Sequence, residues 1–373
     1  MKKIARDCDI VSGNADLEPI FSIKNFPVFQ GCVDSNRVDD LLSDLDFYIS
    51  PTSGMVQLNP LLPLDVIYQG EHNPGSVGQV WHRHHRCFAE FINKYRPNKV
   101  FEIGGSHGLL SENYYTLDPN CDWTIIEPAP APVVKLRAKL ITGSFDDSTC
   151  IDQNTDMVVH SHVLEHMYDP QEFFNNLSRM PHETLMCFSI PNLNSNLLDK
   201  HTNALSFEHT YLCVEEYVEY WLAQSDYQML EKIYHDQHSI FYAAIKKHHV
   251  TKSEMPTLYN KNKKLLDDFT AYYDKEISDI NRVVQNWSGC VYLFGAHIFS
   301  QFLIARGLKI EKIKCILDNS VLKQGLRLYG TNFSVASPKE IEDNSLVILR
   351  TGSYTEEIKK DILTNINPTT TFI

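Results

Sequence analysis

One short segment constrains the fold more than any other: an apolar strand that runs directly into a glycine-rich turn. Residues 99–103 read Lys-Val-Phe-Glu-Ile, and Gly-Gly-Ser-His-Gly follows at 104–108 before a helix opens at Leu109. Glycine has no Cβ atom, so the backbone can turn tightly there and approach a ligand. The start of the following helix offers free N–H groups. This order is typical of an α/β protein.

The same alternation of strands and helices covers two stretches of the chain. From residue 99 to about 248, short apolar strands alternate with helices, which favours a parallel sheet, and a second alternation begins at Val291. Residues 76–96 predict an amphipathic helix, and residues 252–287 predict one long polar helix. Residues 1–75 have many turn formers and only short apolar runs, so we expect irregular structure there.

Composition narrows the functional classes. The chain has 373 residues and a net charge of −13, which argues against a protein that tracks nucleic-acid phosphates. No apolar run approaches the roughly 20 residues of a membrane span, and the N-terminus does not resemble a signal peptide. We therefore expect a cytoplasmic protein, a monomer or a homodimer, without nucleic-acid or membrane partners.

Metal ligands are not expected from the sequence. The nine cysteines include no CxxC pair. His82, His84 and His85 lack a carboxylate or cysteine partner at metal-ligand spacing, so we interpret them as a solvated or pocket-rim cluster. His160 and His162 are two residues apart, which would place them on one face of an extended chain.

Acidic and aromatic residues after the glycine turn indicate a nucleoside cofactor. Glu102, two residues before the first glycine of the turn, suits a cationic ligand better than a pyrophosphate. Glu127 ends the next strand about 20 positions later, where a carboxylate can accept both ribose hydroxyls. Phe145 and Asp146 end a further apolar segment and offer an aromatic face and an acceptor for adenine. Because the glycine pattern is not GxGxxG, we favour S-adenosylmethionine over a dinucleotide.

Several motifs then give a family resemblance over nearly the full length. The central region resembles class I S-adenosylmethionine-dependent methyltransferases, and the whole chain resembles the three-part C-methyltransferases of nucleotide-linked deoxyketosugars. The matching segments are Glu-Ile-Gly-Gly-Ser-His-Gly at 102–108, Val-Leu-Glu-His-Met-Tyr-Asp-Pro at 163–170, Pro-Asn-Leu at 191–193, Glu-His-Thr-Tyr at 208–211, and Phe-Gly-Ala, Asp-Asn, Lys-Gln-Gly and Tyr-Gly at 294–296, 318–319, 323–325 and 329–330.

The resemblance implies a fold, a domain plan and an activity. We expect a Rossmann-like methyltransferase domain with a small irregular N-terminal domain and a second Rossmann-like domain that helps to bind the nucleotide end of the acceptor. The expected division is a degenerate zinc-binding-like domain at 1–75, the cofactor-binding domain at 76–250, a linking helix at 251–287 and the C-terminal domain at 288–373. The expected activity is methylation of a nucleotide-linked sugar or related small polar acceptor in glycan, polysaccharide or natural-product biosynthesis.

Two sets of site residues follow from position and resemblance together. The predicted catalytic residues are His166 as the base, Glu208, His209, and Tyr211 as a donor to an oxyanion. The predicted cofactor contacts are Glu102, Gly104, Gly105, Gly108, Glu127, Phe145, Asp146 and His160.

The sequence departs from the family around the expected acceptor pocket. Of the usual zinc cysteines only Cys8 remains, while Val11, Ser50 and Ser53 occupy the other positions, and one thiol cannot hold zinc. The segment 68–73 is changed, and Ser206 replaces a tyrosine. Two alternatives therefore stay open: an O-methyltransferase of a phosphorylated small molecule, and a non-catalytic partner subunit that binds the cofactor.

Overall fold

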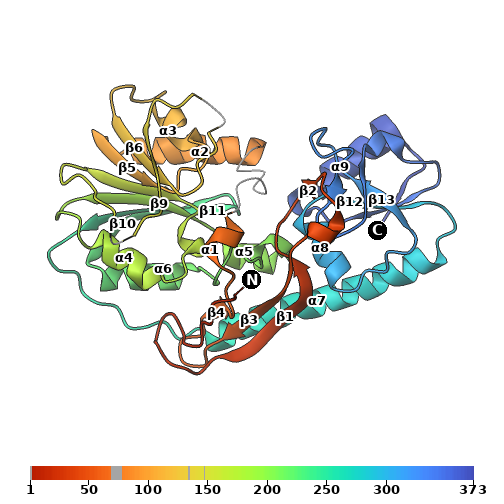
Figure 1. Cartoon of the computed structure of the whole chain (residues 1–373), viewed down its shortest axis with the longest axis horizontal. Helices are drawn as coiled ribbons and strands as arrows, with labels where there is room; N and C mark the ends of the chain where they lie inside the picture. The colour runs from red at the N-terminus through yellow and green to blue at the C-terminus, as the bar shows by residue number, and fades with distance from the viewer. Residues whose placement is uncertain (1, 69–77, 133–134, 147) are drawn as a thin grey trace. The chain divides into compact units, whose positions relative to one another are not determined.

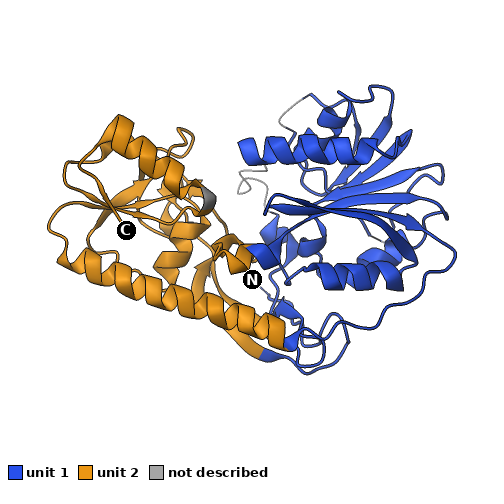
Figure 2. Cartoon of the chain, turned by 180° about the vertical axis from the view of Figure 1, so that it is seen from behind, with its two compact units in different colours: residues 1–18, 49–195, 208–259 blue, residues 19–48, 196–207, 260–373 orange. Residues whose placement is uncertain are grey.

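The computed structural model describes residues 2–68, 78–132, 135–146 and 148–373. The chain forms two compact units (Figure 2). The first comprises residues 1–18, 49–195 and 208–259, and the second comprises residues 19–48, 196–207 and 260–373. The chain thus passes between the units several times, and its N-terminal region contributes to both. The predicted four-part division stays a prediction.

The first unit is built on a seven-stranded sheet of order β10-β11-β9-β8-β5-β6-β7 (Figure 1). Its strands are β5 (Lys99–Ile103), β6 (Asp122–Glu127), β7 (Lys139–Thr142), β8 (Met157–Ser161), β9 (Leu185–Pro191), β10 (Tyr227–His235) and β11 (Ser239–Lys246). The strands from β5 to β9 are parallel, whereas β11 is antiparallel to both of its neighbours. The alternation predicted for residues 99–248 is confirmed.

Helices cover both faces of this sheet. Figure 1 shows α2 and α3 on one face and α4 and α6 on the other. The helices of this part of the chain are α1 (Leu64–Ile67), α2 (Gln79–Asn93), α3 (Leu109–Tyr114), α4 (Pro170–Leu177), α5 (Leu193–Leu198) and α6 (Glu215–Gln224). The predicted helix at 76–96 corresponds to α2, which buries Phe88, Phe91 and Ile92 against the sheet.

The N-terminal region is more regular than we expected. It contains β1 (Glu18–Pro27), β2 (Cys32–Val33), β3 (Leu42–Ile49) and β4 (Val56–Leu58), and a three-stranded sheet has the order β1-β3-β4. The prediction of irregular structure was wrong because β3 carries a period-two pattern: Leu45, Phe47 and Ile49 are buried, and the residues between them are half-buried.

The second unit contains a five-stranded parallel sheet of order β15-β13-β12-β16-β17. Its elements include β12 (Val291–Phe294), β13 (Ile313–Leu317), β14 (Arg327–Leu328), β15 (Val335–Ala336), β16 (Leu346–Leu349), β17 (Thr371–Phe372), α8 (Ile298–Ala305) and α9 (Thr355–Asp361). The rings of Phe21, Phe269 and Phe302 pack together in its core. The second alternation from Val291 is confirmed.

The long helix of the second unit starts later than predicted. Helix α7 spans Tyr259–Asn286, whereas the expected helix began at residue 252. Residues 252–258 are not helical, because Pro256 disfavours a helical conformation in the residue before it. Across the residues that the structure describes, no helix combines the length and the apolar character needed to cross a membrane.

Candidate active site

The glycine turn follows β5 at the point where the order of the parallel strands reverses. Strand β6 pairs with β5 on one side and β8 pairs with it on the other, and ligands of open α/β sheets bind at such a switch point. Gly104 and Gly108 both have φ of +73°. A Cβ atom on Gly104 would lie 2.5 Å from Val163 Cγ2, and one on Gly108 would lie 2.0 Å from Leu136 Cδ2. The fold itself therefore requires glycine at both positions.

Gly105 is the third predicted glycine contact. A Cβ atom there would lie 2.4 Å from Ile125 Cγ2, a side chain of the neighbouring strand β6. The turn is thus pressed against β6 on one side and against the segment after β8 on the other.

Glu127, at the end of β6, is fixed by backbone N–H groups. Its Oε2 accepts a hydrogen bond from the N–H of Ser106 at 2.9 Å, and its Oε1 accepts one from the N–H of Ala129 at 3.0 Å. Each oxygen of a carboxylate has two lone pairs, so both can accept a further hydrogen bond. The glycine turn and Glu127 are therefore brought together, as predicted, with acceptor capacity left over.

Glu102 is enclosed in the protein. Its side chain accepts a hydrogen bond from Trp123 Nε1 at 2.7 Å, and only 2% of the residue is exposed. Burial raises the pKa of Glu102 to about 7; the Trp123 hydrogen bond opposes this shift and the nearby charge of Glu127 adds to it.

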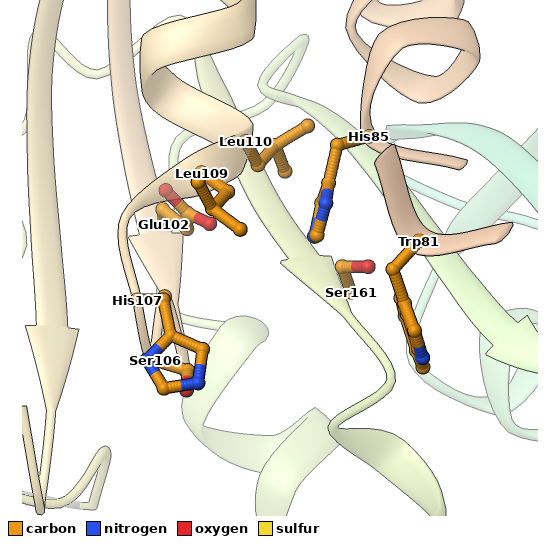
Figure 3. A pocket seen from close by; sticks show the side chains of 10 residues that line it. Trp81, His85, Glu102, Ser106, His107, Leu109, Leu110 and Ser161 are labelled. Atoms are coloured by element: carbon orange, nitrogen blue, oxygen red, sulfur yellow. The ribbon is translucent and has the colours of Figure 1, made fainter. Parts of the chain in front are cut away.

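A small cavity lies beside the turn and is bordered by Glu102. Its volume is about 40 Å³. Figure 3 shows Trp81 and His85 of α2 on one side of it, Glu102 and His107 on the other, and Ser161 of β8 between them. A space of this size holds a polar group of a few atoms, not a whole nucleoside.

Of the two predicted adenine contacts, Phe145 packs on the face of the sheet opposite to α2 (Figure 1). The ring of Phe145 packs edge-on against Phe173 of α4, with centroids 5.5 Å apart. Asp146 is exposed, and its Oδ1 accepts hydrogen bonds from the backbone and the hydroxyl of Ser148. The Ser148 hydrogen bonds lower the pKa of Asp146, so its carboxylate is ionised near neutral pH.

His160 belongs to the core. Its ring is fully buried, stacks on Phe188 at 4.7 Å and meets Phe173 edge-on. His162, in contrast, contacts Trp81 and His84 on the α2 side. The prediction that His160 and His162 share one face was wrong, because the extended strand ends at Ser161 and His162 has φ of +54°.

The predicted base, His166, lies in a short 3₁₀ turn (Leu164–His166) after β8. Its ring faces that of His209, with centroids 5.5 Å apart, and its Nε2 lies 3.6 Å from Glu165 Oε1. Burial lowers the pKa of His166 to about 3, and His209 adds to this effect. Burial also raises the pKa of Glu165 to about 8. Both side chains are therefore mainly uncharged at neutral pH.

Glu208 lies beside this pair. It is half-buried, and burial raises the pKa of its carboxyl group. The adjacent residue His209 also points toward His166. Three of the four predicted catalytic residues, Glu208, His209 and His166, are thus neighbours.

Tyr211 has a different position from the one expected. It is 1% exposed, and its hydroxyl donates to the carbonyl of Leu164. An oxyanion donor must reach the substrate, so this prediction was wrong in its role: the hydroxyl is used to hold the turn that carries His166. The segment around Tyr211 also bonds to β4, through Leu58 N–H to Thr210 O and Leu212 N–H to Val56 O.

Arg6 ties the two candidate catalytic segments together, and this role has no signal in the sequence. Its guanidinium donates to the carbonyls of Thr210 at 2.9 Å and Tyr168 at 2.6 Å. Thr210 in turn donates from its backbone N–H to Glu165 O and from its hydroxyl to Met167 O. Arg6 is 8% exposed. A lone arginine in an apparently irregular region has no sequence signal, whereas Glu165 could have been noticed beside His166.

A polar network occupies the region of Ser50 and Ser53, two of the positions at which the family resemblance led us to look for zinc ligands. The hydroxyl of Ser50 donates to Asp16 Oδ2 at 3.1 Å and accepts from the backbone N–H of Ser53. Thr52 donates to the same Asp16 oxygen. Of the altered segment 68–73, only Tyr68 lies within the described residues.

The second unit contains its own strand-end carboxylate. Asp318 follows β13 and accepts a hydrogen bond from the backbone N–H of Ala296 at 2.9 Å. It also forms an ion pair with Lys323, with Nζ and Oδ2 3.0 Å apart. Ala296 follows β12, so this arrangement repeats the one between Ser106 and Glu127. The Asp318 carboxylate already bonds to Ala296 and Lys323, so this turn serves as a scaffold unless a ligand uses the remaining lone pairs of the carboxylate.

Solved structures of similar shape were found, each over a part of this chain. Human N-acetylserotonin methyltransferase in complex with S-adenosylmethionine is 14% identical, with a TM-score of 0.37, over 45% of this chain and 52% of that one. The N,N-8-amino-8-demethyl-D-riboflavin dimethyltransferase RosA from Streptomyces davawensis is 15% identical, with a TM-score of 0.36, over 44% of this chain and 55% of that one. The PH0226 protein from Pyrococcus horikoshii OT3 is 13% identical, with a TM-score of 0.38, over 46% and 93%.

This chain thus matches about half the length of the first two of these proteins. No family model and no curated protein matches the sequence.

Proposed function

We propose that this protein is an S-adenosylmethionine-dependent methyltransferase that acts on a nucleotide-linked sugar or a related small polar acceptor. One observation carries the proposal: three neighbouring strands, β6, β5 and β8, end in Glu127, the glycine turn and the segment of His166. The contact of Val163 with Gly104 joins the last two. A cofactor site and a candidate base therefore share one edge of the sheet.

The residues at the glycine turn fit S-adenosylmethionine. Glu127 would accept hydrogen bonds from the ribose hydroxyls of the cofactor, and Phe145 and Asp146 would contact its adenine. The bound cofactor supplies a methyl group on a positively charged sulfur. Helix α3 has only six residues and carries Glu112 in its first turn, so it is a poor partner for a pyrophosphate. The carboxyl group of Glu102 beside the turn also favours a cationic ligand over an anionic one.

His166 removes the proton from the acceptor. A base must be unprotonated before it acts, and burial keeps the imidazole of His166 in that state, while the same lowered pKa makes it a weaker base than a free imidazole. For methylation at carbon the proton comes from an acceptor carbon beside a ketone, and for methylation at oxygen it comes from an acceptor hydroxyl group. His166 can serve as the base in either reaction. Glu208 and His209 lie beside His166 and position the acceptor.

The nucleotide-linked sugar is the favoured acceptor because of the motifs at residues 163–170 and 208–211. A phosphorylated small molecule is the alternative, given the changed residues at 50, 53 and 206. The choice between methylation at carbon and at oxygen depends on which acceptor the enzyme takes.

The cofactor part of the proposal is tested by thermal unfolding with S-adenosylhomocysteine. A ligand that binds only the folded state at 100 times its Kd adds about 2.7 kcal/mol to the free energy of unfolding. We expect a clear rise in Tm that saturates with ligand concentration. An unchanged Tm at millimolar ligand would contradict the proposed cofactor.

The acceptor is tested with methyl-labelled S-adenosylmethionine and a panel of nucleotide sugars and phosphorylated metabolites. NMR of the product then locates the methyl group on carbon or oxygen. Tight cofactor binding with no labelled product from any acceptor would instead support the non-catalytic partner subunit.

A further inference from the structure

Three histidines from separate parts of the first unit converge beside the proposed active site. His84 lies in α2, His162 follows β8, and His238 lies in the turn between β10 and β11. Each offers one ring nitrogen, and the three atoms lie within 4.8 Å of one another. His84 is fully buried and the other two are half-buried. Imidazole nitrogen is a common ligand of divalent transition metals.

The three rings are directed at one point, which Ser239 Oγ marks. That oxygen lies 3.2 Å from His84 Nδ1, 2.9 Å from His162 Nε2 and 2.6 Å from His238 Nδ1. A hydroxyl group has a single hydrogen, so it can donate to only one of the three nitrogens. Because Oγ itself lies at that point, a metal ion bound there would take its place, and the three imidazoles would form a three-histidine ligand set with the fourth position open to water.

Two of the three outward ring nitrogens, those of His84 and His162, face an oxygen acceptor, as in metal-binding histidines. His84 Nε2 lies 3.1 Å from Ser161 Oγ, and His162 Nδ1 lies 3.5 Å from Glu165 Oε1. A histidine bound to metal through one nitrogen usually donates its other N–H to an oxygen or a carboxylate.

Glu165 provides an independent observation that points the same way. Its side chain is completely buried, and neither carboxylate oxygen has a hydrogen-bond partner among the residues described. A buried carboxyl group without a partner is costly. If a metal holds His162 through Nε2, the ring proton must be on Nδ1, and Glu165 Oε1 is the acceptor that it faces.

The backbone at His162 is consistent with a site that aims this side chain. Its φ of +54° is unusual for a residue other than glycine. The indole of Trp81 covers the cluster, with ring centroids 4.8 Å from His162, 4.8 Å from His238 and 5.2 Å from His84.

We propose that His84, His162 and His238 bind a divalent transition metal ion such as Zn²⁺, which displaces the Ser239 hydroxyl from between the three rings, with Glu165 accepting from His162. The proposal does not depend on methyl transfer. Glu165, His166 and His209 form a second group of possible ligands. That group is less suitable, because His166 Nδ1 is buried with no partner among the described residues.

Cobalt binding to the metal-free full-length protein tests the proposal in solution. Co²⁺ in a tetrahedral site gives visible absorption bands, and a paramagnetic ion this close to Trp81 quenches its fluorescence. We expect both signals to saturate at one ion per chain. The quenching should disappear in Trp81→Phe, while the absorption bands remain. Absence of saturable binding would overturn the proposal.

Matched variants then locate the ion. His162→Asn, which tolerates a positive φ, and His238→Asn should abolish the bands, whereas His235→Asn should keep them, because His235 stacks on Phe241 outside the cluster. Glu165→Gln should keep the bands but weaken Co²⁺ binding about 10- to 100-fold. Bands that survive in His162→Asn and His238→Asn, or that vanish only in His166→Asn and His209→Asn, would contradict the assignment.

A crystal of the unaltered protein soaked in Zn²⁺ avoids any dependence on variant folding. An anomalous difference peak among the three histidines would support the proposal. A peak only at Glu165, His166 and His209, or only at the His182–His248 pair whose rings lie 3.6 Å apart, would overturn it.

Discussion

Val163 packs directly over Gly104, so that a Cβ atom on Gly104 would lie 2.5 Å from Val163 Cγ2. This contact joins the two parts of the proposed active site, because Gly104 belongs to the cofactor turn and Val163 begins the segment that carries His166. The close approach is possible only for a residue without a side chain.

Gly104→Ala should therefore lower both stability and cofactor affinity. The positive φ alone costs about 1–3 kcal/mol in an alanine, and the contact with Val163 adds to this. Urea unfolding measures the loss. The double variant Gly104→Ala/Val163→Ala should recover the part that arises from the clash and keep the part that arises from φ; no recovery at all would mean that the contact is not the cause.

Glu127→Gln should weaken S-adenosylhomocysteine binding by about 10- to 100-fold. Hydrogen bonds to a charged group contribute about 1.5–3 kcal/mol, and the amide loses the charge while it keeps the shape. Isothermal titration calorimetry gives the Kd of each protein. Glu90→Gln, an exposed change on α2, is the matched control and should bind normally.

His166→Ala should reduce kcat by about 10²-fold or more, because a positioned base contributes this much to proton removal. The Kd for S-adenosylhomocysteine should stay within a few-fold of the original value, since His166 is not among the proposed cofactor contacts. Steady-state kinetics with the identified acceptor provide the measurement. A variant with near-normal kcat would remove His166 from the mechanism.

Arg6→Ala should lower kcat and also reduce stability by about 2–4 kcal/mol, because it removes two hydrogen bonds from a charged donor, a buried one to the carbonyl of Thr210 and a partly buried one to that of Tyr168. Arg6→Lys can replace one bond but not both, so it should be intermediate in both measurements. Lys2→Ala, an exposed change in the same region, serves as the control. Equal kcat values in Arg6→Ala, Arg6→Lys and the original protein would show that the Arg6 clamp, meaning its hydrogen bonds to Thr210 and Tyr168, has no effect on the two candidate catalytic segments.

The stability of the protein should depend on pH through Glu102. Its pKa is about 7 in the folded protein and about 4.5 in the unfolded chain. Between these values the folded state retains a proton that the unfolded state has lost, so rising pH lowers the free energy of unfolding by up to about 1.4 kcal/mol per pH unit. The stabilising effect is complete below pH 4.5 and is lost as the pH passes 7.

Urea unfolding of the original protein and of Glu102→Gln across this pH range tests the assignment. The difference in stability between the two proteins should shift in favour of the glutamine variant as the pH rises. A difference that does not change with pH would show that Glu102 keeps an ordinary pKa.

Local sequence features predicted a large part of this structure. The glycine turn, Glu127 and the helix at 79–93 follow from short-range patterns, since each depends on neighbouring residues along the chain. The cluster of His84, His162 and His238 could not be predicted, because its members come from three elements that only the folded sheet brings together.

Two errors have simpler causes. The strands of the N-terminal region are hard to predict although β3 carries an alternating pattern, because many turn-forming residues surround this short strand. Tyr211 was assigned to the substrate because the sequence motif does not reveal which way its hydroxyl points, and the fold directs it to Leu164.

The clamp formed by Arg6 and β4 has a consequence for how this chain can be divided and how it can evolve. The side chains that act in the proposed chemistry lie between residues 102 and 209, yet the groups that hold their two segments in register come from residues 6 and 56–58. A fragment cut at residue 76 would carry every proposed catalytic side chain and lack that clamp. A substitution in the first 60 residues that alters these contacts therefore also affects the segments of His166 and His209. We expect substitutions in the two regions to depend on each other, although the regions are distant in the sequence.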